Sequence, residues 1–309
     1  MLILELMEIG MIGLGRMGGN MASRLLRANH RVIGFDRSAE AVKGVEAQGG
    51  VGAGSLDELA RSFQDHPRIF WVMLPAGDPT SQTIDTLVKS SDKADIIIDG
   101  GNTNWRDAVK DAERVKAAGR HYLDAGTSGG IWGNQYGYCL MVGGERPIFD
   151  HCLPLFKSLA PDEGGLVYTG PEGSGHFVKM VHNGIEYAMM QAYAEGFNLM
   201  KASAYPDMDL EAIAQAWRYG SVVRSWLLDL IADGLEKDPQ LSSLRGYVED
   251  TGEGRWTVDT AIDAAVPTPV IALALFERFR SREQNSFADR MLAMMRNQFG
   301  GHAVQAASG

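Results

Sequence analysis

The sequence predicts a doubly wound α/β sheet followed by an all-α C-terminal domain, and three observations support this prediction. Short apolar runs alternate with helix-compatible segments through the first half, and their lack of strict polar alternation is typical of parallel strands covered on both faces. Turn formers then cluster in TGPEGSG (169–175), after which helical periodicity dominates. At 309 residues the chain exceeds the usual size of one hydrophobic core. We therefore expect two domains, residues 1–172 and 173–309.

The expected elements follow from these patterns in chain order. The first domain should contain strands at Glu8–Gly13, Arg31–Asp36, Arg68–Leu74, Asp95–Asp99, His121–Asp124 and Tyr138–Val142. Helices should lie between them at Gly18–Ala28, Leu56–Ser62, Ser81–Lys89 and Asn104–Ala118. The second domain should contain helices at His176–Met200, Asp209–Trp217, Val222–Asp233 and Pro269–Phe299.

Composition excludes several classes of protein. The formal net charge of -10 argues against nucleic acid or an anionic membrane as partner. Two cysteines, with no C-x-x-C, do not make a disulfide framework, so we expect a cytoplasmic location and no metal site. No apolar run reaches the roughly 18 residues that span a bilayer. The first residues, MLILELMEIG, lack a signal peptide's basic region, and Met7 is an alternative start.

A glycine-rich turn predicts a nucleotide site of the Rossmann type. Gly13, Leu14, Gly15, Arg16, Met17 and Gly18 form G-x-G-x-x-G between an apolar strand and a helix. The first glycine permits the tight turn, the second lets a pyrophosphate approach the backbone, and the third allows close helix–strand packing. Amide groups at the helix N-terminus would bind the phosphates. The alternative, a glycine-rich turn without a ligand, fits this context less well.

The end of the second expected strand bears on the choice of cofactor. Asp36 lies 18 residues past Gly18, where a carboxylate accepts hydrogen bonds from the ribose hydroxyls and repels a 2′-phosphate. Arg37 leaves NADP open, because a guanidinium there can pair with that phosphate. We expect NAD, with NADP as the alternative. Leu74, Pro75 and Ala76 should pass along the cofactor at the carboxyl edge of the sheet.

Two further strand ends carry polar and glycine residues. DGGN ends at Asn102, and DAGTSGG runs from Asp124 through Ser128 and Gly129 to Gly130. Both should lie at the carboxyl edge of the sheet, where ligands of open α/β folds bind. The glycines leave backbone N–H groups accessible, and these groups, together with Asn102 and Ser128, suit a carboxylate or a hydroxyl-rich ligand. The alternative is two ordinary strand-to-helix turns.

Five polar residues share one face of the long helix that opens the second domain. Lys179, His182, Asn183, Glu186 and Tyr187 fall at i, i+3, i+4, i+7 and i+8. Apolar neighbours, among them Val178, Met180, Val181, Ile185, Met189 and Met190, make both flanks look buried. Since buried polar groups need partners, the strip predicts a ligand.

These segments together resemble the 6-phosphogluconate dehydrogenases of the β-hydroxyacid dehydrogenase superfamily. The resemblance rests on G-x-G-H-F-V-K-M-V-H-N-G-I-E-Y (173–187), GLGRMGGN, DGGN, TSGG, WRYGSVVRSWLLDL (217–230), GRWT (254–257) and RNQFGGH (296–302). It covers essentially the whole chain, and the length resembles that of the short bacterial form. It implies oxidative decarboxylation of 6-phosphogluconate in the pentose phosphate pathway.

The resemblance also implies residue roles. Lys179 matches the general base that takes the proton of the substrate 3-hydroxyl, and Glu186 the acid that protonates the enediol at C1. Burial beside a cationic nicotinamide ring would favour the neutral amine that a base requires. The substrate-contacting set matches Asn102, Ser128, Gly129, Gly130, His182 and Asn183, and the phosphate-binding set matches Tyr187, Arg282, Arg296 and His302. Asn102 also belongs to the cofactor edge.

In longer relatives the residues that match Arg296 and His302 come from the neighbouring subunit. The resemblance therefore implies a homodimer or homotetramer with shared active sites.

One segment departs from the family pattern. Where many long enzymes carry a lysine and a threonine before the tryptophan, this chain has Thr251 and Glu253, and Glu253 would repel a phosphate that it faced. Arg255 could compensate.

Two other functions fit parts of the sequence. A dehydrogenase for a small unphosphorylated 3-hydroxy acid, of the 3-hydroxyisobutyrate or tartronate-semialdehyde type, shares the Lys-x-x-x-Asn pair but lacks Glu186 and the Arg/His tail. A non-catalytic dinucleotide sensor would have no reason to keep Lys179 together with Glu186.

Overall fold

A computed structural model describes residues 5–305, so the proposed choice between Met1 and Met7 as the start lies partly outside it. The chain divides into two compact units, Met1–His182 and Asn183–Gly309. The division falls inside one continuous helix, α9 (Ser174–Lys201), whose first turns belong to the first unit. Each unit is described by itself.

The first unit is built on an eight-stranded sheet in the order β3-β2-β1-β4-β5-β6-β7-β8. Its strands are β1 (Glu8–Ile12), β2 (Arg31–Phe35), β3 (Val51–Ala53), β4 (Ile69–Val72), β5 (Ile96–Asp99), β6 (His121–Ser128), β7 (Cys139–Gly144) and β8 (Leu166–Gly170). Strands β1 to β6 pair in parallel. The order reverses beside β1, which is the point at which such sheets bind nucleotides. The predicted doubly wound sheet is confirmed.

The far edge of the sheet differs from the prediction of parallel strands. β7 runs antiparallel to β6, with Ser128 opposite Cys139, and β8 then pairs in parallel with β7. The predicted strand at Tyr138–Val142 is thus present but reversed. Only the short loop, 3-10 turn and helix of residues 129–138 separate β6 from β7, which is too short for a parallel crossover.

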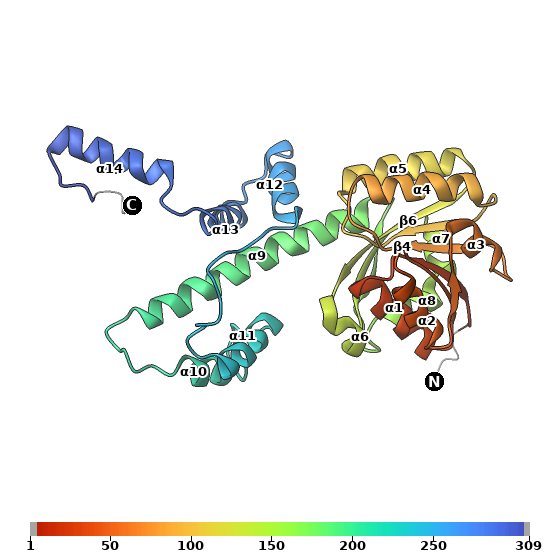
Figure 1. Cartoon of the computed structure of the whole chain (residues 1–309), viewed down its shortest axis with the longest axis horizontal. Coiled ribbons are helices and arrows are strands. Elements are labelled where there is room, and N and C mark those ends of the chain that lie inside the picture. The colour runs from red at the N-terminus through yellow and green to blue at the C-terminus, as the bar shows by residue number, and fades with distance from the viewer. Residues whose placement is uncertain (1–4, 306–309) are drawn as a thin grey trace. The chain divides into compact units, whose positions relative to one another are not determined.

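Helices cover both faces of this sheet (Figure 1). They are α1 (Arg16–Arg27), α2 (Ala39–Glu46), α3 (Leu56–Arg61), α4 (Asp78–Ser90), α5 (Trp105–Ala117), α6 (Gly133–Tyr136), α7 (Arg146–His151) and α8 (Leu153–Leu159). Side chains at the N-caps fix several starts, since Ser38, Ser55 and Asn104 accept hydrogen bonds from amides in the first turns of α2, α3 and α5.

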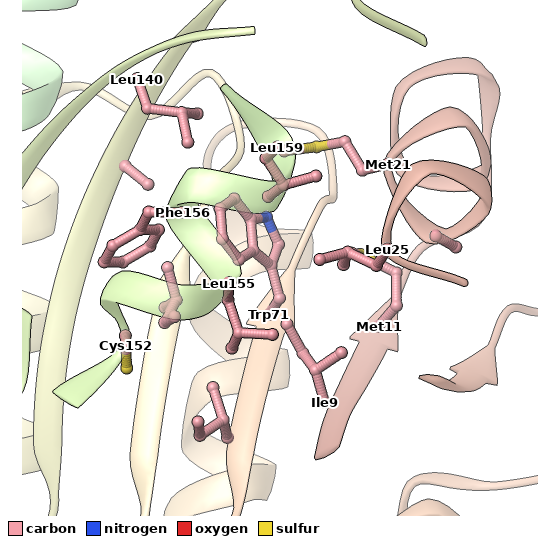
Figure 2. Packing of buried hydrophobic residues seen from close by; sticks show 14 of the residues in the cluster. Ile9, Met11, Met21, Leu25, Trp71, Leu140, Cys152, Leu155, Phe156 and Leu159 are labelled. Atoms are coloured by element: carbon pink, nitrogen blue, oxygen red, sulfur yellow. The ribbon is translucent and has the colours of Figure 1, made fainter. Parts of the chain in front are cut away.

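Each face of the sheet has its own core, because alternate side chains of a strand point to opposite faces. Trp71 of β4 packs with α1 and α8, whereas its neighbours Phe70 and Val72 pack with residues of α3, α4 and α5. Figure 2 shows Trp71 between Phe156, Leu159 and Leu25. The rings of Trp71 and Phe156 meet edge to face, with centroids 6.0 Å apart. This rigid body holds the strand ends that form the site.

The second unit is all-helical, as predicted. Besides the rest of α9 it contains α10 (Leu210–Trp217), α11 (Trp226–Lys237), α12 (Glu253–Asp263), α13 (Pro269–Arg280) and α14 (Phe287–Gly300). The prediction of a single helix over Pro269–Phe299 is wrong. Helix α13 ends at Arg280, and Ser286 starts α14 by accepting a hydrogen bond from the amide of Asp289. The start expected at Val222 is also wrong, since Ser225 caps α11 instead.

Candidate active site

The three glycines of the first turn have three different environments. Gly13 has a φ of +91°, and a Cβ there would lie 2.4 Å from the carbonyl oxygen of Met73. At Gly18 a Cβ would lie 1.9 Å from the carbonyl oxygen of Gly13, so α1 can pack this closely only without a side chain. Gly15 is exposed and a Cβ there would meet nothing within 4 Å. Its backbone is therefore open to a ligand.

The start of α1 fits the pyrophosphate of a dinucleotide. The helix begins at Arg16, and no side chain caps its first amides. Helix N-termini carry a partial positive charge and unpaired N–H groups, which bind phosphate. Of the remaining predicted residues in this loop, Leu14 is buried, Met17 is half-buried and Arg16 is exposed.

Asp36 lies directly after β2 and is held from two sides. Its Oδ2 accepts the amide of Leu14 at 2.7 Å, and its Oδ1 accepts the amide of Ser38 at 2.8 Å. An ionised carboxylate has about four acceptor positions, so both oxygens keep capacity for ribose hydroxyls. Arg37 is exposed beside it.

The loop after β4 lies at the same edge. Pro75 and Ala76 are exposed, Leu74 is half-buried, and the Pro75 carbonyl accepts the Thr80 hydroxyl at 2.8 Å.

Gly18 provides a direct test of this packing. We expect Gly18→Ala to lower the melting temperature and to weaken NAD binding, because the new Cβ must push α1 away from the Gly13 carbonyl. Gly44→Ala is the matched control, since that glycine lies within α2 with nothing within 4 Å of a Cβ. An exposed helical Gly→Ala change should stabilise by about 0.5–1 kcal/mol. Differential scanning fluorimetry with and without NAD makes the comparison, and equal behaviour of the two variants would contradict the packing argument.

The glycines after β5 serve packing as well as any ligand. A Cβ at Gly100 would lie 2.1 Å from Nε1 of Trp71, and one at Gly101 would lie 2.7 Å from the Leu74 carbonyl oxygen. Asn102 follows them and is half-buried. Close packing therefore accounts for the two glycines.

The loop after β6 brings two predicted substrate residues together. Ser128 ends β6, and its Oγ lies 3.4 Å from Nε2 of His182 on α9. Gly129 and Gly130 follow with φ of +130° and +51°, which L side chains rarely adopt.

Lys179 lies where α9 packs directly on β6. A Cβ at Gly126 would lie 2.5 Å from Cβ of Lys179 and 2.7 Å from the carbonyl oxygen of Gly175. The lysine is half-buried. Burial raises the pKa of the Cys139 thiol, and the charge of Lys179 opposes that rise.

Asn183 and Tyr187 meet a buried carboxylate in the second unit. Glu253 is 4% exposed; its Oε1 accepts the amide of Asn183 at 2.7 Å, and its Oε2 accepts the hydroxyl of Thr251. Tyr187 accepts the backbone amide of Thr251 at 3.3 Å. Because a carboxylate can only accept, the Asn183 NH₂ group must face Glu253. The sequence marked Glu253 as a departure near the phosphate, and the structure shows it bound to Asn183 instead.

Three arginines of the second unit differ in their partners. Arg282 and Arg255 both bind Asp250, at 2.7 and 2.8 Å, and hydrogen bonds from Arg255 first and then Arg282 lower the pKa of Asp250 to about 2. Arg278, which the sequence did not single out, stacks 3.6 Å from the centre of the Tyr187 ring. It donates to the carbonyl of Glu249. Its partners are neutral, so its charge is better placed for an anion than that of Arg282.

Two predicted phosphate residues are not brought to the others within the second unit. Arg296 and His302, on α14 and just after it, are exposed, and among residues 5–305 no hydrogen bond or ion pair joins them to Tyr187 or Arg282. No residue of α14 is buried. The expectation that both flanks of the polar strip on α9 are buried is wrong for Val178, Ile185, Met189 and Met190, which are exposed. Glu186 is half-buried.

Comparisons with known proteins cover both units. Residues 8–170 match the model of the NAD binding domain of 6-phosphogluconate dehydrogenase, and residues 175–307 match that of its C-terminal domain. The chain is 44% identical to an NAD(+)-dependent, decarboxylating 6-phosphogluconate dehydrogenase of Haloferax volcanii, covering 96% of this chain and 98% of that protein.

Solved structures show the same fold. A 6-phosphogluconate dehydrogenase of Plasmodium falciparum superposes with a TM-score of 0.83 at 26% identity, covering 97% of this chain and 66% of that one. A 3-hydroxyisobutyrate dehydrogenase of Mycobacterium tuberculosis has a TM-score of 0.72 at 22% identity, covering 90% and 95%.

Proposed function

Because the chain belongs to the 6-phosphogluconate dehydrogenase family, we propose that it oxidatively decarboxylates 6-phospho-D-gluconate to D-ribulose 5-phosphate and CO2 with reduction of NAD. The observation that carries this proposal is the match of both units to that family, with 44% identity to an NAD(+)-dependent relative over nearly the whole chain. The open backbone at Gly15 supports a dinucleotide, and the carboxylate of Asp36 supports NAD over NADP.

Lys179 acts first in the proposed mechanism. Its neutral amine accepts the proton of the 3-hydroxyl while the hydride on C3 leaves for the nicotinamide, which supplies the hydride acceptor. The 3-keto acid that results loses its carboxylate as CO2, and the electron pair of the broken bond forms an enediol as protonated Lys179 returns its proton to the oxygen on C3. Glu186 then gives its proton to C2 of the former substrate, which becomes C1 of ribulose 5-phosphate, while the hydroxyl on C3 passes its proton back to Lys179 and becomes the carbonyl of the product. The two groups are seven residues apart on one helix, about 10 Å along its axis.

Other residues of the chain hold the substrate. Ser128 and His182, already in contact, offer hydrogen bonds to the hydroxyls and carboxylate of the sugar acid, with Asn102, Gly129 and Gly130 at the strand ends. Glu253 accepts a hydrogen bond from the side-chain NH₂ group of Asn183, so the side-chain oxygen of Asn183 is directed away from Glu253. We assign the phosphate to Tyr187, Arg278 and Arg282 of the second unit.

We further propose that a second copy of the chain completes the phosphate site with Arg296 and His302. The support is that α14 carries exposed Met291, Leu292, Met294, Met295 and Phe299 and buries no residue of its own. Large exposed apolar surfaces mark interaction sites. A homodimer or homotetramer follows, and sedimentation velocity distinguishes the two.

A cytoplasmic location is part of the same proposal. Among residues 5–305 no helix is both long and apolar enough to cross a membrane. Cys139 and Cys152 are free thiols, which suits a reducing compartment.

An assay with several substrates tests the function. The purified protein is mixed with 6-phosphogluconate or 3-hydroxyisobutyrate together with NAD or NADP. Tartronate semialdehyde, which is the oxidised partner of its reaction, is mixed with NADH or NADPH. We expect NADH to form from 6-phosphogluconate. Turnover of the small acids alone would favour the second candidate, whose fold this chain shares.

Asp36→Ser tests the cofactor assignment. We expect kcat/KM for NAD to fall about tenfold, because roughly 1.4 kcal/mol of charge-assisted hydrogen bonding to the ribose is lost. NADP should gain relative to NAD, since the carboxylate no longer repels its 2′-phosphate. The melting temperature without cofactor controls for the loss of the Leu14 and Ser38 contacts. An unchanged ratio of the two cofactors would show that Asp36 does not face the ribose.

A further inference from the structure

A buried charged cluster ties the start of α9 to the end of β5 and the middle of β6. His176 is 2% exposed, and Asp99 and Asp124 are 0% exposed. Nε2 of His176 lies 3.4 Å from Oδ2 of Asp99. The amide of His176 donates to Oδ2 of Asp124 at 2.8 Å, and the amide of Gly173 donates to its Oδ1 at 2.7 Å. The mechanism above uses none of these three side chains.

Such a cluster is expensive to bury, so its arrangement requires a cause. An isolated buried charge costs several kcal/mol, and paired charges only recover that cost with good geometry. Burial by itself would lower the pKa of His176, but the negative charges of Asp99 and then Asp124 outweigh burial and raise it. The structure therefore favours a protonated imidazole at this position.

The cluster lies one helical turn before Lys179. Residues at i and i+3 on a helix are neighbours, with Cβ atoms about 5–6 Å apart. Lys179 acts on His176 in turn, since its charge opposes the protonation of the imidazole. The absence of a side chain at Gly126 and Gly175 lets this part of α9 lie directly on β6. A substitution at His176 must therefore change both the electrostatic environment and the position of Lys179.

We propose that His176 is a positioning residue for Lys179, which anchors the first turn of α9 between Asp99 and Asp124 and places a fixed positive charge beside the Lys179 amine. The proposal rests on the function proposed above, because it assumes that Lys179 is the base. Loss of the positive charge lets Lys179 hold its proton to higher pH, and a protonated amine cannot accept the 3-hydroxyl proton.

Other ionisable groups around His176 do not reverse this sign. The groups that face the cluster are Asp99 from β5, Tyr122 and Asp124 from β6, Asp111 from α5, and Lys179 from α9. Burial raises the pKa of Tyr122 well above its usual value, so it stays neutral. The carboxylates can only add negative charge, and they favour the protonated amine more once the imidazolium is gone.

His176→Gln tests the proposal by the pH dependence of kcat/KM. We expect the acid limb to move upward by about one pH unit, which corresponds to about 1.4 kcal/mol of charge interaction. His121→Gln is the matched control, because that histidine begins β6 in the same unit and pairs with Glu145 at 3.3 Å, away from Lys179. Its profile should match that of the unaltered protein. An acid limb that stays in place in folded His176→Gln overturns the proposal.

Two measurements keep the inference separate from the proposed function. Amine labelling of Lys179 by acetic anhydride, read by peptide mass spectrometry against pH, reports its proton without turnover. A labelling midpoint that moves to higher pH in His176→Gln supports the proposal. If the midpoint moves but the pH profile of kcat/KM does not, the result contradicts the assignment of Lys179 as the base. Should His176→Gln not fold, ¹⁵N-histidine NMR of the unaltered protein decides. A protonated His176 ring at pH 7 supports the proposal, and a neutral ring overturns it.

Discussion

Lys179→Met should lower the turnover of 6-phosphogluconate by about 10³-fold while NAD binding persists, within the range that general base catalysis contributes. Methionine keeps much of the aliphatic length, so the contact between α9 and β6 at Gly126 is retained. What disappears is the amine that accepts the 3-hydroxyl proton. Stopped-flow formation of NADH measures the step, and isothermal titration measures NAD binding.

Lys201→Met is the matched control for this change. Lys201 ends the same helix and donates to Gln240 at 2.8 Å, away from the strand ends. Its turnover should stay within about twofold of the unaltered enzyme, as for most exposed substitutions. Near-normal turnover of Lys179→Met would remove Lys179 from the chemistry, whatever its place in the structure.

Glu186→Gln should lower steady-state turnover by about 10²-fold and change the shape of the progress curve. Glutamine has nearly the same shape but no proton to give to the carbon that becomes C1 of ribulose 5-phosphate. Because this proton is needed only after hydride transfer, the first turnover should still produce NADH. When the variant is mixed rapidly with NAD and 6-phosphogluconate, we expect a burst of NADH close to one equivalent of active sites, followed by a slow phase.

A glutamate on the same helix controls for the loss of charge. Glu195 is exposed and accepts a hydrogen bond from Gln191 at 2.9 Å, so Glu195→Gln should leave both phases unchanged. A Glu186→Gln variant whose first turnover is as slow as its later ones would place Glu186 in hydride transfer or binding instead. A variant with full activity would exclude it as the acid.

Local patterns account for the parts of the fold that the sequence could predict. The strand before Gly13, the helix after it and the strand that ends at Asp36 each follow from neighbouring residues, and the structure has all three. β3 has only three residues and β8 is a partly exposed edge strand, so neither has the apolar run that marks a strand. The reversal of β7 depends on pairing with β6, which periodicity does not contain.

Contacts between distant residues account for the parts of the site that the sequence could not predict. Asn183 and Glu253 are 70 residues apart, and Gly173 and Asp124 are 49 apart, so no local spacing signals either pair. The acidic residue in TGEGRW (251–256) marks Glu253 as a departure from the family pattern, but the sequence does not indicate that its partner is Asn183. Arg278 gave no signal, because a charge on a helix is usually solvated.

The exposed flanks of α9 show a limit of hydrophobic patterning. Val178, Ile185, Met189 and Met190 are apolar, yet each is exposed in the single chain. A pattern of apolar residues indicates that a helix face favours burial, but it does not indicate which surface buries it.

One measurement tests the central claim most directly. The protein is incubated with NAD and 6-phosphogluconate labelled with ¹³C at C1, and NADH and ¹³CO2 are measured over the same interval. The account predicts equal amounts of both, with ribulose 5-phosphate as the remaining product. NADH without ¹³CO2, or no NADH at all, would contradict it.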